Sequence, residues 1–186
     1  MSYTIAPIVE GHGDVAAVPC LIRMLRPDLR IATPVRFPKT KLVIPSELRR
    51  AVAIALANIP SGKVGLVLVL IDADEDCPAT MGPRLLRELQ TEIGGRAPHG
   101  FVALAKREYE SWLVGGDPAM NEATPETAGD PKGRLKAANG GRYCETADQA
   151  RLSYNIDPAR LEQSSPSFAR FARRIAEIPA PAPDLT

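Results

Sequence analysis

The sequence VGLVLVLIDADED, residues 64–76, indicates the fold class of this chain. Residues 64–71 are apolar at nearly every position, which is typical of a central strand in a parallel sheet that helices cover on both faces. The run leads directly into Asp72 and Asp74. Alternate side chains of an extended chain lie on the same face, so these two carboxylates are expected to point the same way if the strand stays extended through Asp74.

Strand-like and helix-like patterns alternate on either side of this stretch. Such alternation predicts an α/β fold with right-handed crossovers, in which a mostly parallel sheet of about four strands has helices on both faces. Pro34 indicates that the second strand is irregular or lies at an edge, because proline cannot donate a ladder hydrogen bond. Besides residues 64–71, the predicted strands are 3–9, 31–37 and 100–106, and the predicted helices are 14–26, 46–59 and 80–93.

The end of the chain is predicted to be helical and looser. Residues 1–116 are expected to form the core, and residues 117–186 a helical extension packed on the same domain. Residues 117–133 carry almost no large apolar side chains and are expected to form a surface loop. Ser165, which precedes a proline, is expected to begin the last helix. Residues 179–186 are expected to fray.

The composition is that of an ordinary globular protein, with 45% hydrophobic and 24% charged residues among 186. Lys and Arg number 23 against 22 Asp and Glu, so a local patch or a bound metal, rather than the overall charge, would have to attract phosphate. Three cysteines without a CxxC pair and two histidines disfavour a zinc site. Neither a signal peptide nor a membrane-spanning apolar run is evident, so we expect a cytoplasmic protein that does not bind membranes.

Acidic residues collect where the predicted strands end. Glu10 follows the first strand, Asp14 begins the helix after it, and Glu110 comes shortly after the last strand. Together with Asp72 and Asp74, they are expected to meet at the edge of the sheet formed by the carboxyl ends of the strands. Clustered carboxylates raise one another's pKa values unless a cation neutralises them. Because carboxylate ligands without histidine or thiolate favour Mg²⁺ or Mn²⁺, the sequence predicts a divalent-metal site at this edge.

The order of these motifs resembles the TOPRIM fold, which occurs in topoisomerases, bacterial primases, recombination-mediator proteins and the overcoming-lysogenization-defect (OLD) family of nucleases. The resemblance rests on a Glu-Gly turn after the first strand, an Asp-x-Asp after a later strand, and a glutamate beyond the next strand. The E-G-x-x-D form of residues 10–14 is most similar to the OLD branch. E-x-W at residues 110–112 and S-P-S-F-x-x-F at residues 165–171 resemble a group of small stand-alone TOPRIM-like proteins of unknown function.

This resemblance implies a Rossmann-like TOPRIM fold and Mg²⁺-dependent phosphoryl transfer or hydrolysis on nucleic acid, as in a nuclease. Glu10 would act as general acid or base, and Lys106 would stabilise the charge that builds on the phosphate. The implied metal ligands are Glu10, Asp72 and Asp74, with Asp14 and Glu110 available for a second ion. The resemblance also implies an ATPase partner protein, because related proteins are linked with ATPases in defence-type systems.

Two other functions remain open. The same site would suit a non-catalytic subunit that binds metal and docks or regulates the ATPase of a defence-type system. The other is NADP binding, because Gly11, Gly13 and Ala16 fit the G-x-G-x-x-A fingerprint between a strand and a helix. The fingerprint expects an acidic residue after the second strand to hold the ribose, but this chain carries basic residues that would suit only a 2′-phosphate: Arg36, Lys39 and Lys41.

Overall fold

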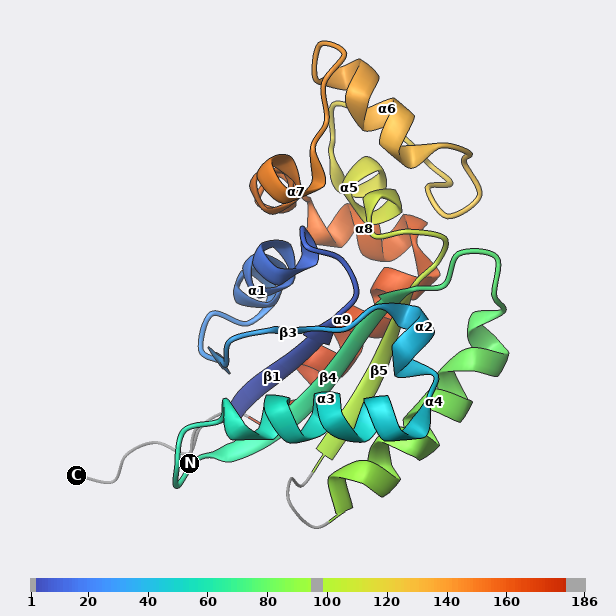
Figure 1. Cartoon of the computed structure of the whole chain (residues 1–186). Coiled ribbons are helices and arrows are strands. Elements are labelled where there is room, and N and C mark those ends of the chain that lie inside the picture. The colour runs from blue at the N-terminus through green and yellow to red at the C-terminus, as the bar shows by residue number, and fades with distance from the viewer. Residues whose placement is uncertain (1–2, 95–98, 180–186) are drawn as a thin grey trace, which may run out of the picture.

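A computed structural model gives the structure of residues 3–94 and 99–179. In this part of the chain, five parallel strands form one sheet in the order β2-β1-β4-β5, and β3 pairs with β1 farther along the same strand (Figure 1). The strands are β1 (Tyr3–Val9), β2 (Arg30–Ile31), β3 (Val35–Arg36), β4 (Val64–Asp72) and β5 (His99–Ala105). The predicted parallel sheet is therefore confirmed, with the strand that ends in Asp72 between the first strand and the last.

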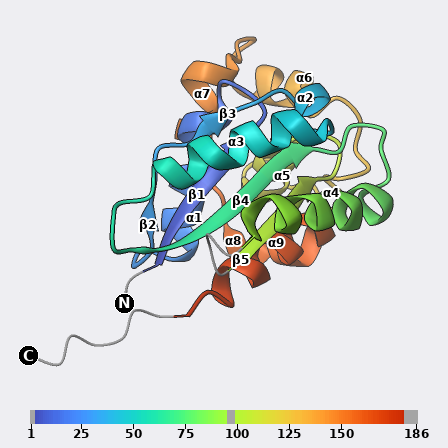
Figure 2. The same ribbon diagram turned by 60° about the horizontal axis from the view of Figure 1, so that its bottom comes forward.

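Helices cover both faces of the sheet, as predicted. In Figure 1, α3 crosses in front of the sheet and α9 lies behind it, and Figure 2 shows the same layers from another direction. The helices are α1 (Asp14–Leu25), α2 (Lys39–Leu42), α3 (Pro45–Ala57), α4 (Pro78–Ile93), α5 (Glu110–Gly116), α6 (Pro131–Ala138), α7 (Glu145–Ser153), α8 (Pro158–Ser164) and α9 (Pro166–Ala176).

Alternation along the strands divides the core into two layers. On β4, Leu68 and Leu70 face a layer built from α1, α5, α7, α8 and α9. Val69 and Ile71 face a second layer, built mainly from α3 and α4. Burial of β4 on both faces accounts for its uninterrupted apolar sequence.

The region between α1 and α3 differs from the prediction. In place of one strand at residues 31–37, two short strands flank Pro34, because the proline interrupts the ladder with β1. The short helix α2 follows and was not predicted. Helix α3 begins at Pro45, after Ile44 as the N-cap, rather than with Ser46 as its cap.

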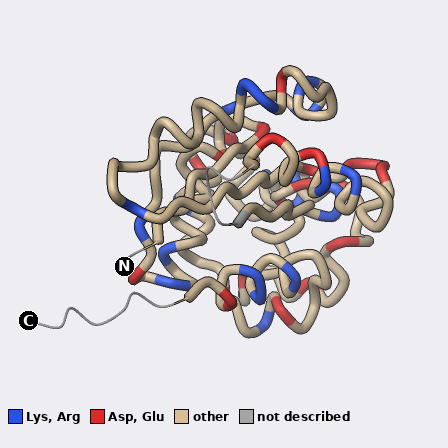
Figure 3. Tube along the Cα trace, turned by 90° about the horizontal axis from the view of Figure 1, so that it is seen from below, with Lys and Arg blue, Asp and Glu red and all other residues tan. Residues whose placement is uncertain are grey.

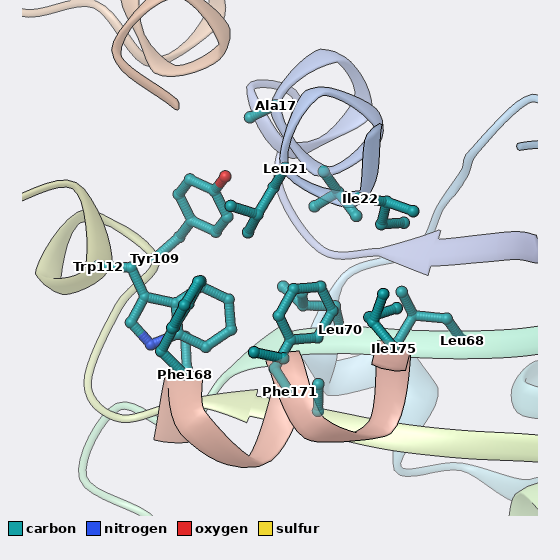
Figure 4. Close-up of a cluster of buried hydrophobic side chains, with 14 of the residues drawn as sticks. Ala17, Leu21, Ile22, Leu68, Leu70, Tyr109, Trp112, Phe168, Phe171 and Ile175 are labelled. Atoms are coloured by element: carbon teal, nitrogen blue, oxygen red, sulfur yellow. The ribbon is translucent and has the colours of Figure 1, made fainter. Parts of the chain in front are cut away.

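The helices after residue 116 share a core with the sheet. Trp112 of α5 stacks on Phe171 of α9 at a ring-centroid distance of 5.4 Å and meets Phe168 edge-on (Figure 4). Its Nε1 donates a hydrogen bond of 2.8 Å to Ser167 Oγ. The E-x-W and S-P-S-F-x-x-F motifs therefore meet in one packed cluster, and the indole is fully buried.

The start of α9 is as predicted, since Ser165 Oγ accepts a hydrogen bond from Phe168 N as the helix cap. Residues 117–130 contain no helix or strand, and α6 begins at Pro131, inside the predicted loop. Residues 180–186 of the end expected to fray lie outside the described residues. None of the helices in residues 3–94 and 99–179 is long and apolar enough to span a membrane.

Candidate metal and catalytic site

The predicted site residues come from the carboxyl ends of the strands and from the helices that follow. Glu10 directly follows β1, Asp72 is the last residue of β4, and Asp14 and Glu110 are the first residues of α1 and α5. Figure 1 shows α5, α7 and α8 gathered beyond these strand ends. The parallel pairing of β1 with β4 brings Glu10 next to Asp72, as the sequence predicted.

Glu10 and Asp72 are joined through the backbone. Glu10 Oε2 accepts a hydrogen bond of 3.4 Å from Asp72 N, and Asp72 Oδ1 in turn accepts one of 2.9 Å from Tyr109 N. Both acidic side chains are partly buried. The N–H groups hold the two carboxylates at adjacent strand ends without neutralising their charge.

Asp14 and Glu110 are more deeply buried, with residue exposures of 5% and 2%. Asp14 accepts hydrogen bonds from Gly11 N at 2.8 Å and from Gln149 Nε2 at 3.0 Å. Glu110 Oε1 accepts one of 2.8 Å from the Tyr143 hydroxyl. Buried carboxylates with fixed donors of this kind are rigidly oriented.

Burial raises the pKa values of all four carboxyl groups, and repulsion from the other three adds to the rise at Asp72. The pKa of Asp72 is well above its usual range because of desolvation and the charges of Asp14, Glu110 and Glu10. Desolvation raises the pKa of Glu110 to about 7 despite the nearby Lys132, and desolvation also raises the pKa values of Asp14 and Glu10. The nearby hydrogen-bond donors and Lys132 therefore do not fully offset the cost of placing these carboxylates together in a buried site.

Asp74 does not point the same way as Asp72. The strand ends at Asp72, and Asp74 has a φ of 50°, a left-handed conformation that aspartate tolerates better than most residues. Its Oδ2 pairs with Lys39 Nζ at 2.8 Å, and Asp76 pairs with the same amine at 2.7 Å. Two parallel carboxylates were expected only if the strand stayed extended, and this condition is not met because the extended backbone ends at Asp72.

Lys106 follows β5 and lies toward the start of α4. The pKa of the Cys77 thiol is lowered mainly by its hydrogen bond with the Thr80 side chain, and the charge of Lys106 adds to this. The backbone N of Lys106 donates a hydrogen bond of 3.3 Å to Ser167 Oγ. Within the described ranges, no ion pair joins Lys106 to a carboxylate. Lys39, whose side chain is only 13% exposed, is the lysine that lines a pocket together with Glu10.

Three residues that contact the site were not predicted, namely Lys132, Tyr143 and Gln149, and Lys39 was considered only as a partner for a 2′-phosphate. Lys132 Nζ lies 4.0 Å from Glu110 Oε1 and pairs with Glu108 at 3.0 Å and Glu145 at 2.8 Å. Lys132, Tyr143 and Gln149 belong to the C-terminal helical region, in which no site residue was predicted. No motif in the sequence marks them, since their role depends on how α6 and α7 pack against α1 and α5.

A pocket of about 690 Å³ opens beside Glu10, between α2, the loop after β4 and the first half of α4. Glu10 therefore contacts the backbone of Asp72 and also lines an accessible cavity. A side chain in this position is able to exchange protons with a bound ligand, which a wholly buried carboxylate is not.

The geometry at Gly13 disfavours the dinucleotide-binding alternative. A Cβ at Gly13 would collide with Gln149 Oε1 and would lie 2.7 Å from the backbone oxygen of Glu145. Helix α7 thus covers the start of α1, where a pyrophosphate would have to approach. The buried carboxyl group of Asp14 at the first position of α1 adds negative charge at the same place.

The donor atoms fit a hard divalent cation. Glu10, Asp14, Asp72 and Glu110 supply only carboxylate oxygens, which Mg²⁺ and Mn²⁺ prefer. Among residues 3–94 and 99–179, no three His, Cys, Asp or Glu side chains are arranged to hold an ion as they stand. Repulsion from Asp14, Glu110 and Glu10 adds to the effect of burial in raising the pKa of Asp72.

Comparison with known proteins gives one family. The model of a family described as "Domain of unknown function (DUF4276)" matches residues 9–176. The match runs from the last residue of β1 to the last residue of α9, so it includes the four carboxylates and the C-terminal helices that contact them. No curated protein and no solved structure matches the chain.

Proposed function

Since the chain belongs to this family, DUF4276, whose description names no activity, we propose from the site that it is a divalent-metal-dependent nuclease. The observation that supports this most strongly is the position of Glu10. Its carboxylate accepts a hydrogen bond from Asp72 N on one side and lines the 690 Å³ pocket on the other. A catalytic carboxylate needs both a fixed orientation and access to substrate.

In this proposal Asp72, Asp14 and Glu110 hold the metal with Glu10, and Asp74 lies on the pocket side. The bound ion would supply Lewis-acid polarisation of the phosphate and lower the pKa of a water molecule. The repulsion that raises the carboxyl pKa values would be relieved when a cation enters. The resemblance to TOPRIM nucleases, rather than the geometry itself, directs the proposal to nucleic acid.

Glu10 is the proton-transfer group in this proposal. Desolvation raises its pKa, and the charge of Asp74 raises it further, whereas the Asp72 N–H lowers it. A carboxyl group with a raised pKa is a better general acid or base near neutral pH than an ordinary surface glutamate. Lys39, on the same pocket, is positioned to meet a phosphate oxygen once Asp74 and Asp76 release it, and Lys106 remains a second candidate for that role.

Charge on the protein as a whole does not select nucleic acid. Lys and Arg are interspersed with Asp and Glu along the trace (Figure 3), and the formal net charge is +1. Binding would therefore depend on the metal and on a few local side chains, so it should weaken only moderately as salt increases.

The test is cleavage of labelled single-stranded and duplex DNA and RNA by purified protein with Mg²⁺, with Mn²⁺ and with EDTA. We expect cleavage that requires the metal and is lost in Glu10→Gln but kept in Glu75→Gln, whose side chain is 89% exposed. If no substrate is cleaved while Mn²⁺ still binds, the nuclease proposal fails and a metal-binding subunit that acts with a partner ATPase becomes the better account.

A further inference from the structure

The pocket beside Glu10 has an apolar interior. Val43 and Met81 are partly buried and Leu85 is 2% exposed, and all three line the cavity. Thr40 and Thr80 add a hydroxyl from each of the two facing helices, α2 and α4. The volume of about 690 Å³ is in the range of pockets that hold a small organic ligand. An apolar, planar group with a few polar edge atoms fits this lining.

The charged side chains of the pocket restrict what else enters it. Four are acidic and two are basic, and both bases are already paired: Lys39 with Asp74 and Asp76, and Arg84 with Glu88 at 3.1 Å. A free anion would therefore be repelled from this pocket. The pocket suits an uncharged ring. A phosphate attached to that ring fits only at the end of the pocket near Glu10, where a cation would neutralise the phosphate charge.

We propose that this pocket binds one unpaired nucleobase, whose phosphate lies at the end of the pocket formed by Glu10 and Asp74. The proposal rests on the proposed function, because the metal there compensates the phosphate charge. The base lies between α2 and α4, against Val43, Met81 and Leu85, with Thr40 and Thr80 available as hydrogen-bond partners for its edge.

This arrangement selects single-stranded nucleic acid or a free nucleotide over duplex. The cavity is enclosed by helices on two sides, so only a base that has left its stack and its partner fits inside. In a duplex, that step costs the energy of unstacking and unpairing, whereas an unpaired base is already available.

The test places a large side chain in the pocket, either from α4 or from α2. Thr80→Trp and Thr40→Trp each place a large ring in the cavity from an exposed helical position, so both proteins should fold. Gln90→Trp is the matched control, because it is an exposed neutral position on α4 that does not line this pocket. Binding of a fluorescent single-stranded oligonucleotide is measured by anisotropy with Ca²⁺ replacing Mg²⁺, and binding of a duplex of the same sequence is measured in parallel.

We expect the single strand to bind at least tenfold more tightly than the duplex, and Thr80→Trp and Thr40→Trp each to weaken that binding at least tenfold. Gln90→Trp should bind as the unaltered protein does. Competition by AMP or CMP at concentrations similar to those of the oligonucleotide assigns the ligand to free nucleotides, whereas competition by oligonucleotides alone assigns it to a strand. Equal binding of strand and duplex, or unchanged binding by both filled variants, would overturn the proposal.

The result separates this inference from the nuclease proposal. Pocket-dependent binding without cleavage in any metal would keep the nucleobase site and contradict the nuclease. Cleavage that persists at full rate in Thr80→Trp and Thr40→Trp would keep the nuclease and contradict the nucleobase site.

Discussion

Gln149 of α7 donates a hydrogen bond of 3.0 Å from its Nε2 to Oδ1 of Asp14, and both side chains are buried although they lie 135 residues apart in sequence. This contact ties the C-terminal helical region to the carboxylates at the strand ends. It also explains why α7 covers Gly13, since the same amide lies against that glycine.

Replacing Gln149 with Met removes this hydrogen bond and keeps a side chain of similar length. Asp14 then retains its bond from Gly11 N but loses its other donor. We expect a loss of about 1–3 kcal/mol in the free energy of unfolding at neutral pH, measured by denaturant titration. Gln163→Met, at an exposed position on α8, should change stability by less than about 0.5 kcal/mol. Equal stability of the two variants would show that the contact with Asp14 carries little energy.

The buried carboxyl of Glu110 predicts a pH dependence in metal-free protein. Its pKa is about 7 in the folded chain against 4.5 for an ordinary glutamate, so the folded state binds more protons between those two values. The contribution of Glu110 to stability therefore falls as the pH rises from 4.5 through 7, by up to about 3 kcal/mol. Glu110→Gln should melt progressively higher than the unaltered protein as the pH increases from 5 to 8 in EDTA. Glu108→Gln, which removes another partner of Lys132, is the control. A melting difference that does not vary with pH would contradict a raised pKa at Glu110.

Asp72 is predicted to be the carboxylate on which metal binding depends most. Mn²⁺ that binds only the folded state raises stability by about 2.7 kcal/mol at a hundred times its dissociation constant. This stabilisation should disappear in Asp72→Asn, which keeps the oxygen that accepts from Tyr109 N. Asp74→Asn should retain part of it, because Asp74 is held by Lys39 at the pocket side. Melting temperatures over a series of Mn²⁺ concentrations check whether Asp72 matters more than Asp74. An Asp72→Asn variant that Mn²⁺ stabilises as much as the unaltered protein would exclude Asp72 as a ligand.

Lys39 is expected to compete with a bound cation. Its amine contacts Asp74, Asp76 and the carbonyl oxygen of Ala73 at 3.0 Å or less. Lys39→Met should lower the stability of the metal-free protein by roughly 1 kcal/mol and increase its stabilisation by Mn²⁺, because Asp74 and Asp76 then lack a counter-charge. Lys41→Met, an exposed position on the same short helix, should do neither. If Lys39→Met reduces the Mn²⁺ response instead, the lysine supports the metal site and does not compete with it.

The sheet and the four carboxylates of the site were predictable from the sequence. A strand buried on both faces needs an uninterrupted apolar run, so β4 was recognisable, and parallel strands bring their carboxyl ends to one edge. Glu10 and Asp72 therefore had to be neighbours once β1 was placed beside β4. Asp14 and Glu110 follow as the first residues of the helices after β1 and β5.

The remaining contacts depend on tertiary packing that leaves no local pattern. Helix α2 has four residues, too few for an apolar period to show, yet it supplies Lys39. The turn at Asp74 depends on a single left-handed residue, which sequence spacing does not reveal. Tyr143 and Gln149 reach the site because α7 packs on α1, and the residues around them in the sequence form no motif.

The central claim, that Glu10 transfers protons in a metal-dependent cleavage, is tested most directly by single-turnover cleavage of a labelled single strand at saturating Mn²⁺. Glu10→Gln should cleave at least about 100-fold more slowly than the unaltered protein, while its Mn²⁺-induced rise in melting temperature is largely retained, because Asp72, Asp14 and Glu110 remain. Cleavage by Glu10→Gln at the rate of the unaltered protein would contradict the claim.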